Sequence, residues 1–376
     1  MDFSNSEEST IIRDNIKKLL VNYSSSDYLL KYDEYKLDLE LFNELKHGGY
    51  LFDLESKNPF NLEFFLIVCE ELGYTNATFD PTQCISDVAM TLSESNTEIA
   101  KSELKKLFSE DDYIFSSALV EPLNYDIESP SLVGKITGEK YCLTGKKIFS
   151  YAADHASCVL ISFICDDGIK LALIDPRLCN VRHTSNTTSK PYFEISFNNF
   201  DISQDQIING DKNGLDILKD ISAKKILIQA SYAKGITNRM IELTSEYTSA
   251  REQFGRPIGS FQAVAHRAAN AFISNQVLDL NLKHVTYKYL NNNECENELL
   301  NLKYILGNTL HEISYTAQHL HGGMGVAKEY PLWRYCLEAK EFELMNGNSK
   351  SALAKLSQNL TSNQYIKFVL QALVMQ

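Results

Sequence analysis

Residues 132–151, LVGKITGEKYCLTGKKIFSY, decide the fold class, because the spacing of apolar residues changes here from a helical to an alternating pattern. Two short apolar stretches flank the turn residues Thr137-Gly138-Glu139. Glycine is common in turns because it tolerates positive φ, and short apolar runs bounded by turn residues are typical of strands. The stretch therefore predicts a β-hairpin.

The alternating pattern continues after this hairpin. Residues 158–176, CVLISFICDDGIKLALIDP, predict a second hairpin that closes at Asp166-Asp167-Gly168. Residues 192–203 predict a further strand, with three apolar side chains on one face: Phe193, Ile195 and Phe197. We expect an antiparallel β domain over residues 116–214.

The chain before this domain has helical spacing. In residues 6–25, SEESTIIRDNIKKLLVNYSS, the polar start is followed by apolar residues that fall on one face of a helix. Residues 58–74, NPFNLEFFLIVCEELGY, repeat this pattern after a proline. We expect an N-terminal helical domain over residues 1–115.

After the β domain the spacing becomes helical again. Long helical segments are predicted at about 215–250, 260–292, 296–321 and 336–373, which predicts a C-terminal four-helix bundle over residues 215–376. Helices, then strands, then helices along the chain indicate an α+β fold, in which the two kinds of structure are segregated.

Composition excludes several classes of function. The net charge of −13 argues against binding to nucleic acid, which needs a clustered positive surface. No apolar run approaches the roughly 20 residues that span a membrane, and the acidic start of the chain differs from a secretory signal, so we expect a cytoplasmic protein. The eight cysteines are scattered, without metal-ligand spacing, so we expect buried thiols and no metal site.

Two loops in the C-terminal third carry candidate binding residues. In residues 249–270, SAREQFGRPIGSFQAVAHRAAN, Arg251 and Arg256 flank Phe254-Gly255. Arginines can pair with a phosphate and stack on a ring, although an exposed loop with solvated arginines is the alternative interpretation. In residues 317–335, AQHLHGGMGVAKEYPLWRY, the glycines allow the backbone to approach a ligand closely.

Together these loops resemble those of the acyl-CoA dehydrogenases, which are FAD-dependent flavoproteins. The family pattern, R-x-x-F-G-x-x-I-x-x-F-Q followed about sixty residues later by Q-x-x-G-G-x-G and E-Y-P, is present in this order. In the family these loops come from the neighbouring subunit of a dimer and hold the adenine and pyrophosphate of FAD. The resemblance therefore implies FAD as the cofactor and a homodimer or homotetramer, with a heteromer as the alternative.

The resemblance assigns roles to individual residues of the two loops. Arg251 would pair with the pyrophosphate, Phe254 and Gln262 would line the adenine, and the backbone of Gly322 and Gly323 would approach the phosphates. The glutamine of the family's second loop falls on His319, with Gln318 beside it, so both are candidates for that role.

In the β domain the resemblance is weaker. The family segment T-E-P-x-x-G-S-D, which holds the flavin and the thioester, corresponds to ALVEPLNYD at 118–126. Val120 stands where the family has a hydroxyl, and larger residues follow. The W-I-T segment that packs on the flavin ring corresponds to Ile148-Phe149-Ser150, which makes Ser150 the expected donor to the isoalloxazine.

The catalytic glutamate of the family is missing. It opens an E-G-T triplet and removes the α-proton of the acyl thioester, but here Asn346 stands at that position, fifteen residues after Pro331. A carboxamide can donate a hydrogen bond but cannot abstract this proton. A second location used by some relatives holds Lys225. Glu343, about one helical turn before Asn346, is a candidate surrogate base, and a solvated surface carboxylate is the alternative.

Three functions follow from the resemblance. The first is α,β-dehydrogenation of an acyl thioester, carried by CoA or a carrier protein, with an atypical or missing base and with electron-transfer flavoprotein or a similar protein as acceptor. The second is a non-catalytic subunit of a heteromeric acyl-CoA dehydrogenase. The third is a flavin monooxygenase or N-hydroxylase of the same fold, which has no need of the base.

Overall fold

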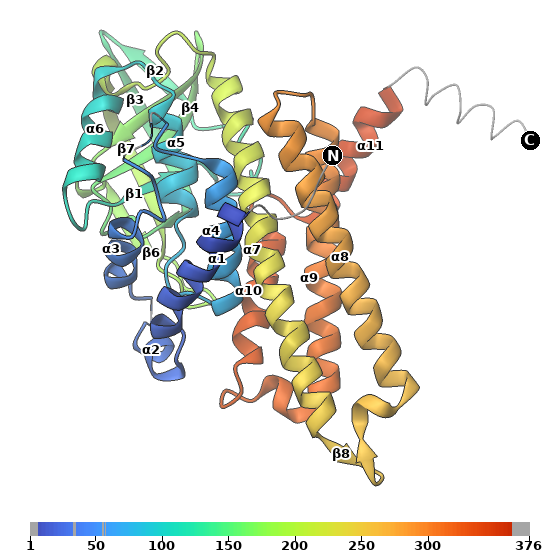
Figure 1. The fold of residues 1–376 in the computed structure, drawn as a ribbon. Coiled ribbons are helices and arrows are strands. Elements are labelled where there is room, and N and C mark those ends of the chain that lie inside the picture. The colour runs from blue at the N-terminus through green and yellow to red at the C-terminus, as the bar shows by residue number, and fades with distance from the viewer. Residues whose placement is uncertain (1–6, 33–34, 55, 57, 363–376) are drawn as a thin grey trace, which may run out of the picture. The chain divides into compact units, whose positions relative to one another are not determined.

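The computed structural model describes residues 7–32, 35–54, 56 and 58–362. Within them the chain forms two compact units, one of residues 7–72 and 77–228 and the other of residues 73–76 and 229–362. Helices and strands are segregated along the sequence, so the expected α+β class is confirmed (Figure 1).

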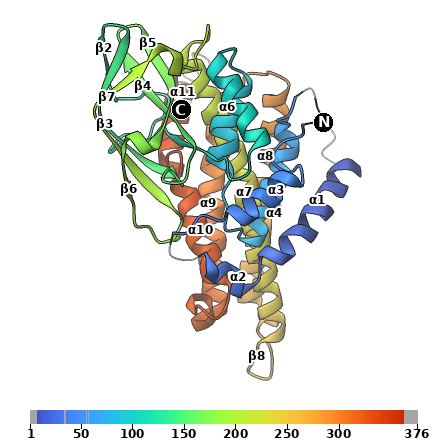
Figure 2. The same cartoon turned by 90° about the vertical axis from the view of Figure 1, so that its left-hand side faces the viewer.

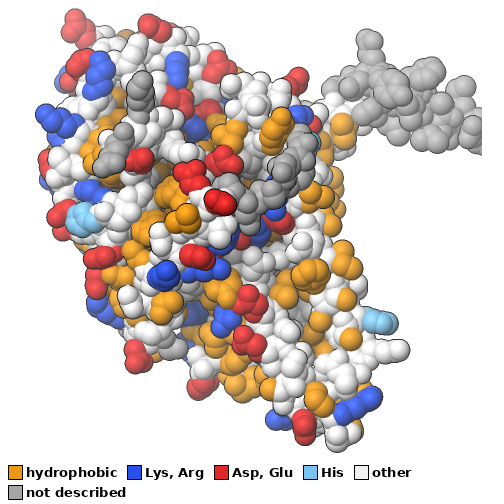
Figure 3. Space-filling model, viewed as in Figure 1, with side chains coloured by type: hydrophobic (Ala, Val, Ile, Leu, Met, Phe, Trp, Pro, Cys, Tyr) orange, Lys and Arg blue, Asp and Glu red, His pale blue; other side chains and the backbone are white. Residues whose placement is uncertain are grey.

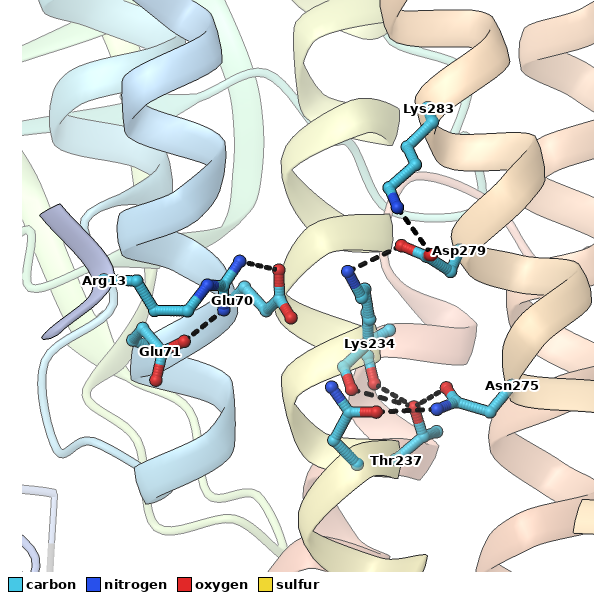
Figure 4. Close-up of polar contacts among 10 residues, drawn as sticks. Arg13, Glu70, Glu71, Lys234, Thr237, Asn275, Asp279 and Lys283 are labelled. Atoms are coloured by element: carbon cyan, nitrogen blue, oxygen red, sulfur yellow. Dashed lines mark hydrogen bonds and ion pairs between the residues drawn. The ribbon is translucent and has the colours of Figure 1, made fainter. Parts of the chain in front are cut away.

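The first unit begins with short helices: α1 (Glu7–Leu20), α2 (Ser26–Lys31), α3 (Leu39–His47), α4 (Leu62–Thr75), α5 (Met90–Ser93) and α6 (Glu98–Ser109). Helix α1 buries Ile16 and Leu20, and its charges, acidic in the first turn and basic in the last, complement the helix dipole. Arg13 joins α1 to α4 by donating to Glu70 at 2.8 Å and to Glu71 (Figure 4).

A π-helical segment, Thr82–Ala89, leads into α5. All eight of its residues are buried. π-Helical geometry is rare and is frequently found at functional sites. The partners of Gln83 and Asp87 in this segment are described below.

The β elements of this unit form two sheets (Figure 2). One has the strand order β1-β4-β5, with β1 (Phe115–Ala118), β4 (Cys158–Cys165) and β5 (Gly168–Ile174). The other has the order β2-β3-β7-β6, with β2 (Gly134–Thr137), β3 (Lys140–Tyr151), β6 (Asn180–His183) and β7 (Tyr192–Ser203). Strands β1 and β4 pair in parallel, which differs from the antiparallel expectation; their connection contains the β2–β3 hairpin.

Both predicted hairpins are present. Thr137 pairs with Lys140 across the Gly138-Glu139 turn, and Cys165 pairs with Gly168 across Asp166-Asp167. The apolar faces of the two sheets meet in one core, which includes three side chains predicted from the alternation in β7: Phe193, Ile195 and Phe197. Burial of side chains of this size contributes about 1.5–3 kcal/mol each, so the period-two pattern is the main source of this core's stability.

The helices of the C-terminal bundle are α7 (Gly214–Ala250), α8 (Gln262–Leu290), α9 (Glu296–His321), α10 (Leu332–Leu344) and α11 (Ser349–Ser362). A two-stranded hairpin, β8 (Glu252–Gln253) and β9 (Arg256–Pro257), follows α7. The predicted helix 336–373 is wrong as a single element, because residues 345–348 separate α10 from α11, and residues 363–373 lie outside the described part. The break occurs where Asn346 and Gly347 adopt positive φ.

Polar groups fix the register of α7 against α8 in the second unit (Figure 4). Asp279 accepts Lys234 at 2.6 Å and Lys283 at 3.0 Å. Thr237 donates to Asn275 at 2.7 Å. A buried polar group is costly without a partner, so these pairs favour one alignment of the two helices.

The outer face of α8 carries exposed apolar side chains (Figure 3), namely Phe272, Ile273, Val277 and Leu280.

In the described ranges no helix is long and apolar enough to cross a membrane. The same residues contain no cluster of His, Cys, Asp or Glu with the arrangement of a metal site.

Candidate functional site

The first candidate binding loop is the hairpin after α7. Phe254 and Gly255 form its two-residue turn, with φ of 53° and 79°, as a type I′ hairpin requires. Phe254 is 94% exposed and its ring lies edge-on to Phe261 at 6.1 Å. A bulky residue with positive φ is strained, so exposing this ring to solvent costs conformational free energy. This geometry presents a flat apolar surface to a ligand or to another chain.

Two arginines lie in the same hairpin or directly before it. Arg251 is exposed just beyond the C-terminus of α7, and its side chain makes no hydrogen bond or ion pair to the described part of the chain. Arg256 lies over the ring of Phe261, 4.2 Å from its centroid. Gln262 is exposed at the first position of α8. Arg251 is thus available for an anion.

The second loop follows α9. Gly322 has φ of 59° and ψ of −134°, a conformation open essentially only to glycine. A Cβ on Gly322 or Gly323 would meet no atom within 4 Å, whereas one on Gly325 would lie 2.7 Å from the carbonyl oxygen of Gln318. Gly325 is therefore required by packing. The open backbone at Gly322-Gly323 leaves room for a ligand to approach.

The two loops lie at the same end of the bundle. His321, the last residue of α9, stacks on Tyr247 of α7 with ring centroids 4.4 Å apart. Its Nδ1 donates to the carbonyl oxygen of Ala317 at 2.7 Å, and its Nε2 lies 3.3 Å from the hydroxyl of Tyr330. Burial lowers the pKa of His321, which favours the neutral ring. This histidine is therefore structural, as its partners occupy both nitrogens.

The other expected residues of the second loop lie in the last turn of α9. Gln318 is half-buried, and His319 is exposed with its ring stacked on Tyr315 at 6.0 Å. Either side chain can reach solvent next to the glycine turn. The structure therefore brings together the glycines, Gln318 and His319 on one loop, and Arg251, Phe254 and Gln262 on the other.

Asn346 lies in the connection between α10 and α11. Its φ of 55° and that of Gly347, 79°, terminate α10. Asparagine tolerates this left-handed conformation better than glutamate does, because its short carboxamide can bond locally. The side chain is half-exposed and makes no hydrogen bond within the described residues. The backbone conformation at position 346 therefore favours asparagine over glutamate.

A buried lysine holds the connection that carries Asn346. The ammonium of Lys303 on α9 donates to the carbonyl oxygens of Phe342 at 3.1 Å and Met345 at 2.5 Å, and to the side chain of Gln229 at 3.3 Å. The carbonyls at the end of a helix lack helical partners, so a cation here caps α10. Burial lowers the pKa of Lys303 to about 7.

Glu343, the candidate surrogate base, lies in the last turn of α10. Its carboxylate forms an ion pair with Lys340 on the same helix, and its side chain is largely buried. Its Cγ also lies close to α9, where a Cβ on Gly307 would approach it to 3.1 Å. These contacts hold the carboxylate in place, and its role as a base stays a prediction.

The second base location is occupied by an ion pair. Lys225 of α7 donates to Oδ2 of Asp87 at 2.7 Å, and Ser117 of β1 donates to the same oxygen at 2.6 Å. Both charged side chains are buried. Burial raises the pKa of Asp87 more than Lys225 lowers it. A carboxylate therefore lies beside this location, but its partners already bind it.

In the β domain, Glu121 has a structural role. It accepts hydrogen bonds from Lys147 and from the backbone of Ser131 and Leu132, at 2.6, 2.7 and 3.0 Å. Burial lowers the pKa of Lys147 to about 8. The pair anchors the segment that resembles the family's flavin-binding stretch. Val120 in that segment forms a bridge to Ile148.

Ser150 is fully buried and its hydroxyl lies 2.7 Å from that of Ser116 on β1. Its side chain is thus engaged within the sheet. The expected donation from Ser150 to a flavin ring stays a prediction, and in this geometry it requires the hydroxyl to leave Ser116 or the backbone to serve instead.

Sequence reasoning missed Gln83, Asp87 and Lys303. Each is a polar residue inside an apolar helical pattern, and such a residue is buried only if it has partners. A polar residue in an apolar pattern can be recognised in the sequence, but its hydrogen-bond partners cannot. Asp87 and Lys225, for example, are 138 residues apart in the chain.

Comparisons with known proteins find similar sequences and similar folds. A family model described as "Acyl-CoA dehydrogenase, C-terminal domain" matches residues 219–361. The chain is 28% identical to acyl-CoA dehydrogenase FadE27 of Mycobacterium tuberculosis over 236 residues, which are 60% of this chain and 62% of that protein. The match therefore spans less than two thirds of this relative's length.

Solved structures share the fold over nearly the whole chain. The ChsE4-ChsE5 complex from Mycobacterium tuberculosis matches with a TM-score of 0.88 at 23% identity, covering 96% of this chain and 100% of the other. PigA, solved with FAD and proline, matches with a TM-score of 0.87 at 22% identity, covering 96% and 99%. Residues 219–361 therefore resemble the C-terminal domain of the acyl-CoA dehydrogenases, and the whole chain shares its fold with the solved structures.

Proposed function

We propose that this chain binds FAD and works as an oxidoreductase on acyl thioesters. The observation that supports this most directly is the pair of loops at one end of the bundle: one carries the exposed ring of Phe254 and Arg251, which has no side-chain partner among the described residues, and the other has a glycine turn open to a ligand. Cationic side chains and exposed backbone N–H groups suit phosphates, and aromatic rings suit adenine. These donor groups fit the dinucleotide end of FAD.

Each loop residue then has a role. Arg251 pairs with the pyrophosphate, and the backbone at Gly322-Gly323 approaches it. Phe254 and Gln262 line the adenine, and Gln318 or His319 supplies a further polar contact. In the β domain, Val120 and the segment around Ser150 face the flavin ring. When bound, FAD accepts the hydride that an acyl thioester loses from its β-carbon.

The α-proton of the thioester needs a base as well. The carboxamide of Asn346 can orient a thioester through hydrogen bonds but cannot take the proton. Glu343 and Asp87 are the carboxylates nearest in sequence or contact to the two base locations, and both are ion-paired. We therefore propose dehydrogenation with an atypical base, and electron-transfer flavoprotein or a similar protein as the electron acceptor.

Anaerobic titration of the FAD-loaded protein tests this reaction. Acyl-CoA thioesters of short, medium and long chain, and a carrier-protein thioester, are added while the visible absorption of the flavin is recorded. We expect at least one of them to bleach the flavin. If the protein holds FAD but no thioester reduces it, the dehydrogenation is contradicted while the cofactor stands.

A second candidate is a non-catalytic subunit of a heteromeric enzyme. It is favoured by one observation: Asn346 has no carboxylate, and Lys225, at the other base location, is bound to Asp87. The structural neighbour ChsE4-ChsE5 is itself a complex of two proteins. This candidate predicts that the chain co-purifies with a related chain that has the glutamate. A homo-oligomer that turns over alone would refute it.

A further inference from the structure

A strained aromatic residue interrupts β3 at the segment proposed to face the flavin. Phe149 has φ of 59°, and the pairing of β3 with β7 shifts register between Lys147 and Ser150. Phe149 is 40% exposed. Bulges redirect side chains and are frequent beside active sites, and a bulky residue with positive φ persists only where its surroundings impose it. The contacts around this bulge show which side chain holds it.

Those contacts come from the side chain of Gln83 in the π-helical segment. Its Nε2 donates to the carbonyl oxygen of Phe149 at 2.7 Å, and its Oε1 accepts the backbone N–H of Tyr151 at 2.7 Å. One carboxamide therefore binds the backbone on both sides of Ser150. Gln83 is itself buried, so these bonds are not shared with bulk water.

The same carboxamide joins the bulge to β1. Its Oε1 lies 3.4 Å from the backbone nitrogen of Ser117 and 3.3 Å from the hydroxyl of Ser116, which contacts Ser150 at 2.7 Å. The hydroxyl of Ser150 is thus turned toward β1. The ring of Phe149 lies edge-on to Tyr192, at 6.3 Å.

We propose that Gln83 is the positioning residue of the flavin site: it holds the β3 bulge so that the ring of Phe149 forms a wall for the planar isoalloxazine of FAD. A rigid, partly exposed aromatic ring suits packing against a flat ring system, and prior fixation lowers the entropy cost of binding. The inference rests on the FAD binding proposed above. In this proposal the π-helical segment helps to position the cofactor.

The test is a double-mutant cycle of Gln83→Met and Phe149→Ala, with FAD affinity and the visible circular dichroism of the bound flavin as readouts. Gln83→Met keeps the side-chain length and removes the four contacts. We expect it to weaken FAD binding about tenfold, equivalent to about 1.4 kcal/mol, and to change the dichroism in the same direction as Phe149→Ala. In the Phe149→Ala background Gln83→Met should add nothing further, because Gln83 acts through that ring.

Thr82→Val is the matched control. Thr82 precedes Gln83, is also buried, and its hydroxyl has no hydrogen-bond partner within the described residues, so its loss should leave both readouts unchanged. Additive losses in the cycle, or a Gln83→Met protein with wild-type affinity and dichroism, overturn the inference. A wild-type protein that takes up no FAD overturns the proposed cofactor instead.

A third measurement decides the matter if Gln83→Met does not fold. Amide hydrogen exchange of the wild-type apoprotein should show the N–H of Tyr151 as protected as its neighbours in β3, since Gln83 accepts it without any ligand. Fast exchange of this amide in otherwise folded apoprotein contradicts a preformed wall. Gln83→Glu, which keeps the acceptor for Tyr151 and loses the donor to Phe149, then replaces Gln83→Met in the cycle.

Discussion

Asn346 has a conformational explanation at the scale of one residue. It ends α10 in the left-handed region, where a side chain longer than asparagine is unfavourable by about 1–2 kcal/mol. We predict that Asn346→Glu lowers the free energy of unfolding by about 1 kcal/mol, whereas Asn346→Gly leaves it nearly unchanged. Chemical denaturation measures both variants. Equal stability of Asn346→Glu and the wild type would show that backbone conformation places no demand on this position.

The buried ammonium of Lys303 should make the free energy of unfolding depend on pH. Burial lowers its pKa from 10.5 to about 7 in the folded protein. Between these values the unfolded chain binds a proton that the folded chain does not, so the free energy of unfolding rises with pH through this window. Below about pH 7 both states are protonated and the full cost of burying the charge is present.

The measurement compares wild type and Lys303→Met. We predict that the stability of the wild type, relative to that of the variant, increases from about pH 7 to about pH 10, because methionine cannot titrate. Other titrating groups, Lys147 among them, are common to both proteins and cancel in the difference. Parallel stability curves for the two proteins would mean that Lys303 keeps an ordinary pKa.

At the scale of elements, the Asp87–Lys225 pair joins the π-helical segment to the N-terminal part of α7. Removal of one buried charge leaves the other without compensation, at a cost of about 3–5 kcal/mol. We predict losses of this order for Asp87→Asn and for Lys225→Met, and a loss in the double variant well below their sum. Guanidinium unfolding of the four proteins gives the coupling energy. Additive losses would show that the two side chains do not interact.

Helix α9 approaches the start of α11 closely at Gly307. A Cβ at this position would lie 2.7 Å from the Cβ of Ser349, and overpacking of this kind costs about 1–3 kcal/mol. Alanine gains at most about 1 kcal/mol of helix propensity over glycine, so overpacking should dominate. We therefore predict that Gly307→Ala lowers the free energy of unfolding.

The neighbouring residue gives the control for this prediction. Asn308 is exposed on the same helix, so Asn308→Ala should be neutral or slightly stabilising through helix propensity alone. A Gly307→Ala protein that gains stability as Asn308→Ala does would contradict the close approach of α9 and α11.

The elements also show what the sequence could predict. Local periodicity was sufficient for both hairpins, for the inward face of β7 and for the long helices, because each depends on neighbouring residues. The break at 345–348 was missed because apolar spacing continues on both sides of it, and only the backbone of Asn346 and Gly347 shows the turn. The parallel pairing of β1 with β4 was missed because no local pattern specifies it.

The residues of the candidate site also fall into two groups, those that the sequence alone can predict and those that only the structure shows. Arg251, Phe254 and the glycines could be found from the sequence because each lies in a short motif that keeps its spacing. Gln83, Asp87 and Lys303 could not, since their hydrogen bonds are made with residues far along the chain that only the fold brings near. The roles of the motif residues remain predictions, as do the domain boundaries at 116 and 215.

At the scale of the whole molecule, the proposed function requires that this chain, with asparagine at position 346, binds FAD. The most direct measurement is the visible absorption spectrum of the purified protein, with release and identification of any bound flavin. We expect a stoichiometric amount of FAD in the wild-type protein and less in Arg251→Gln. A colourless protein that cannot be reconstituted with FAD would contradict it.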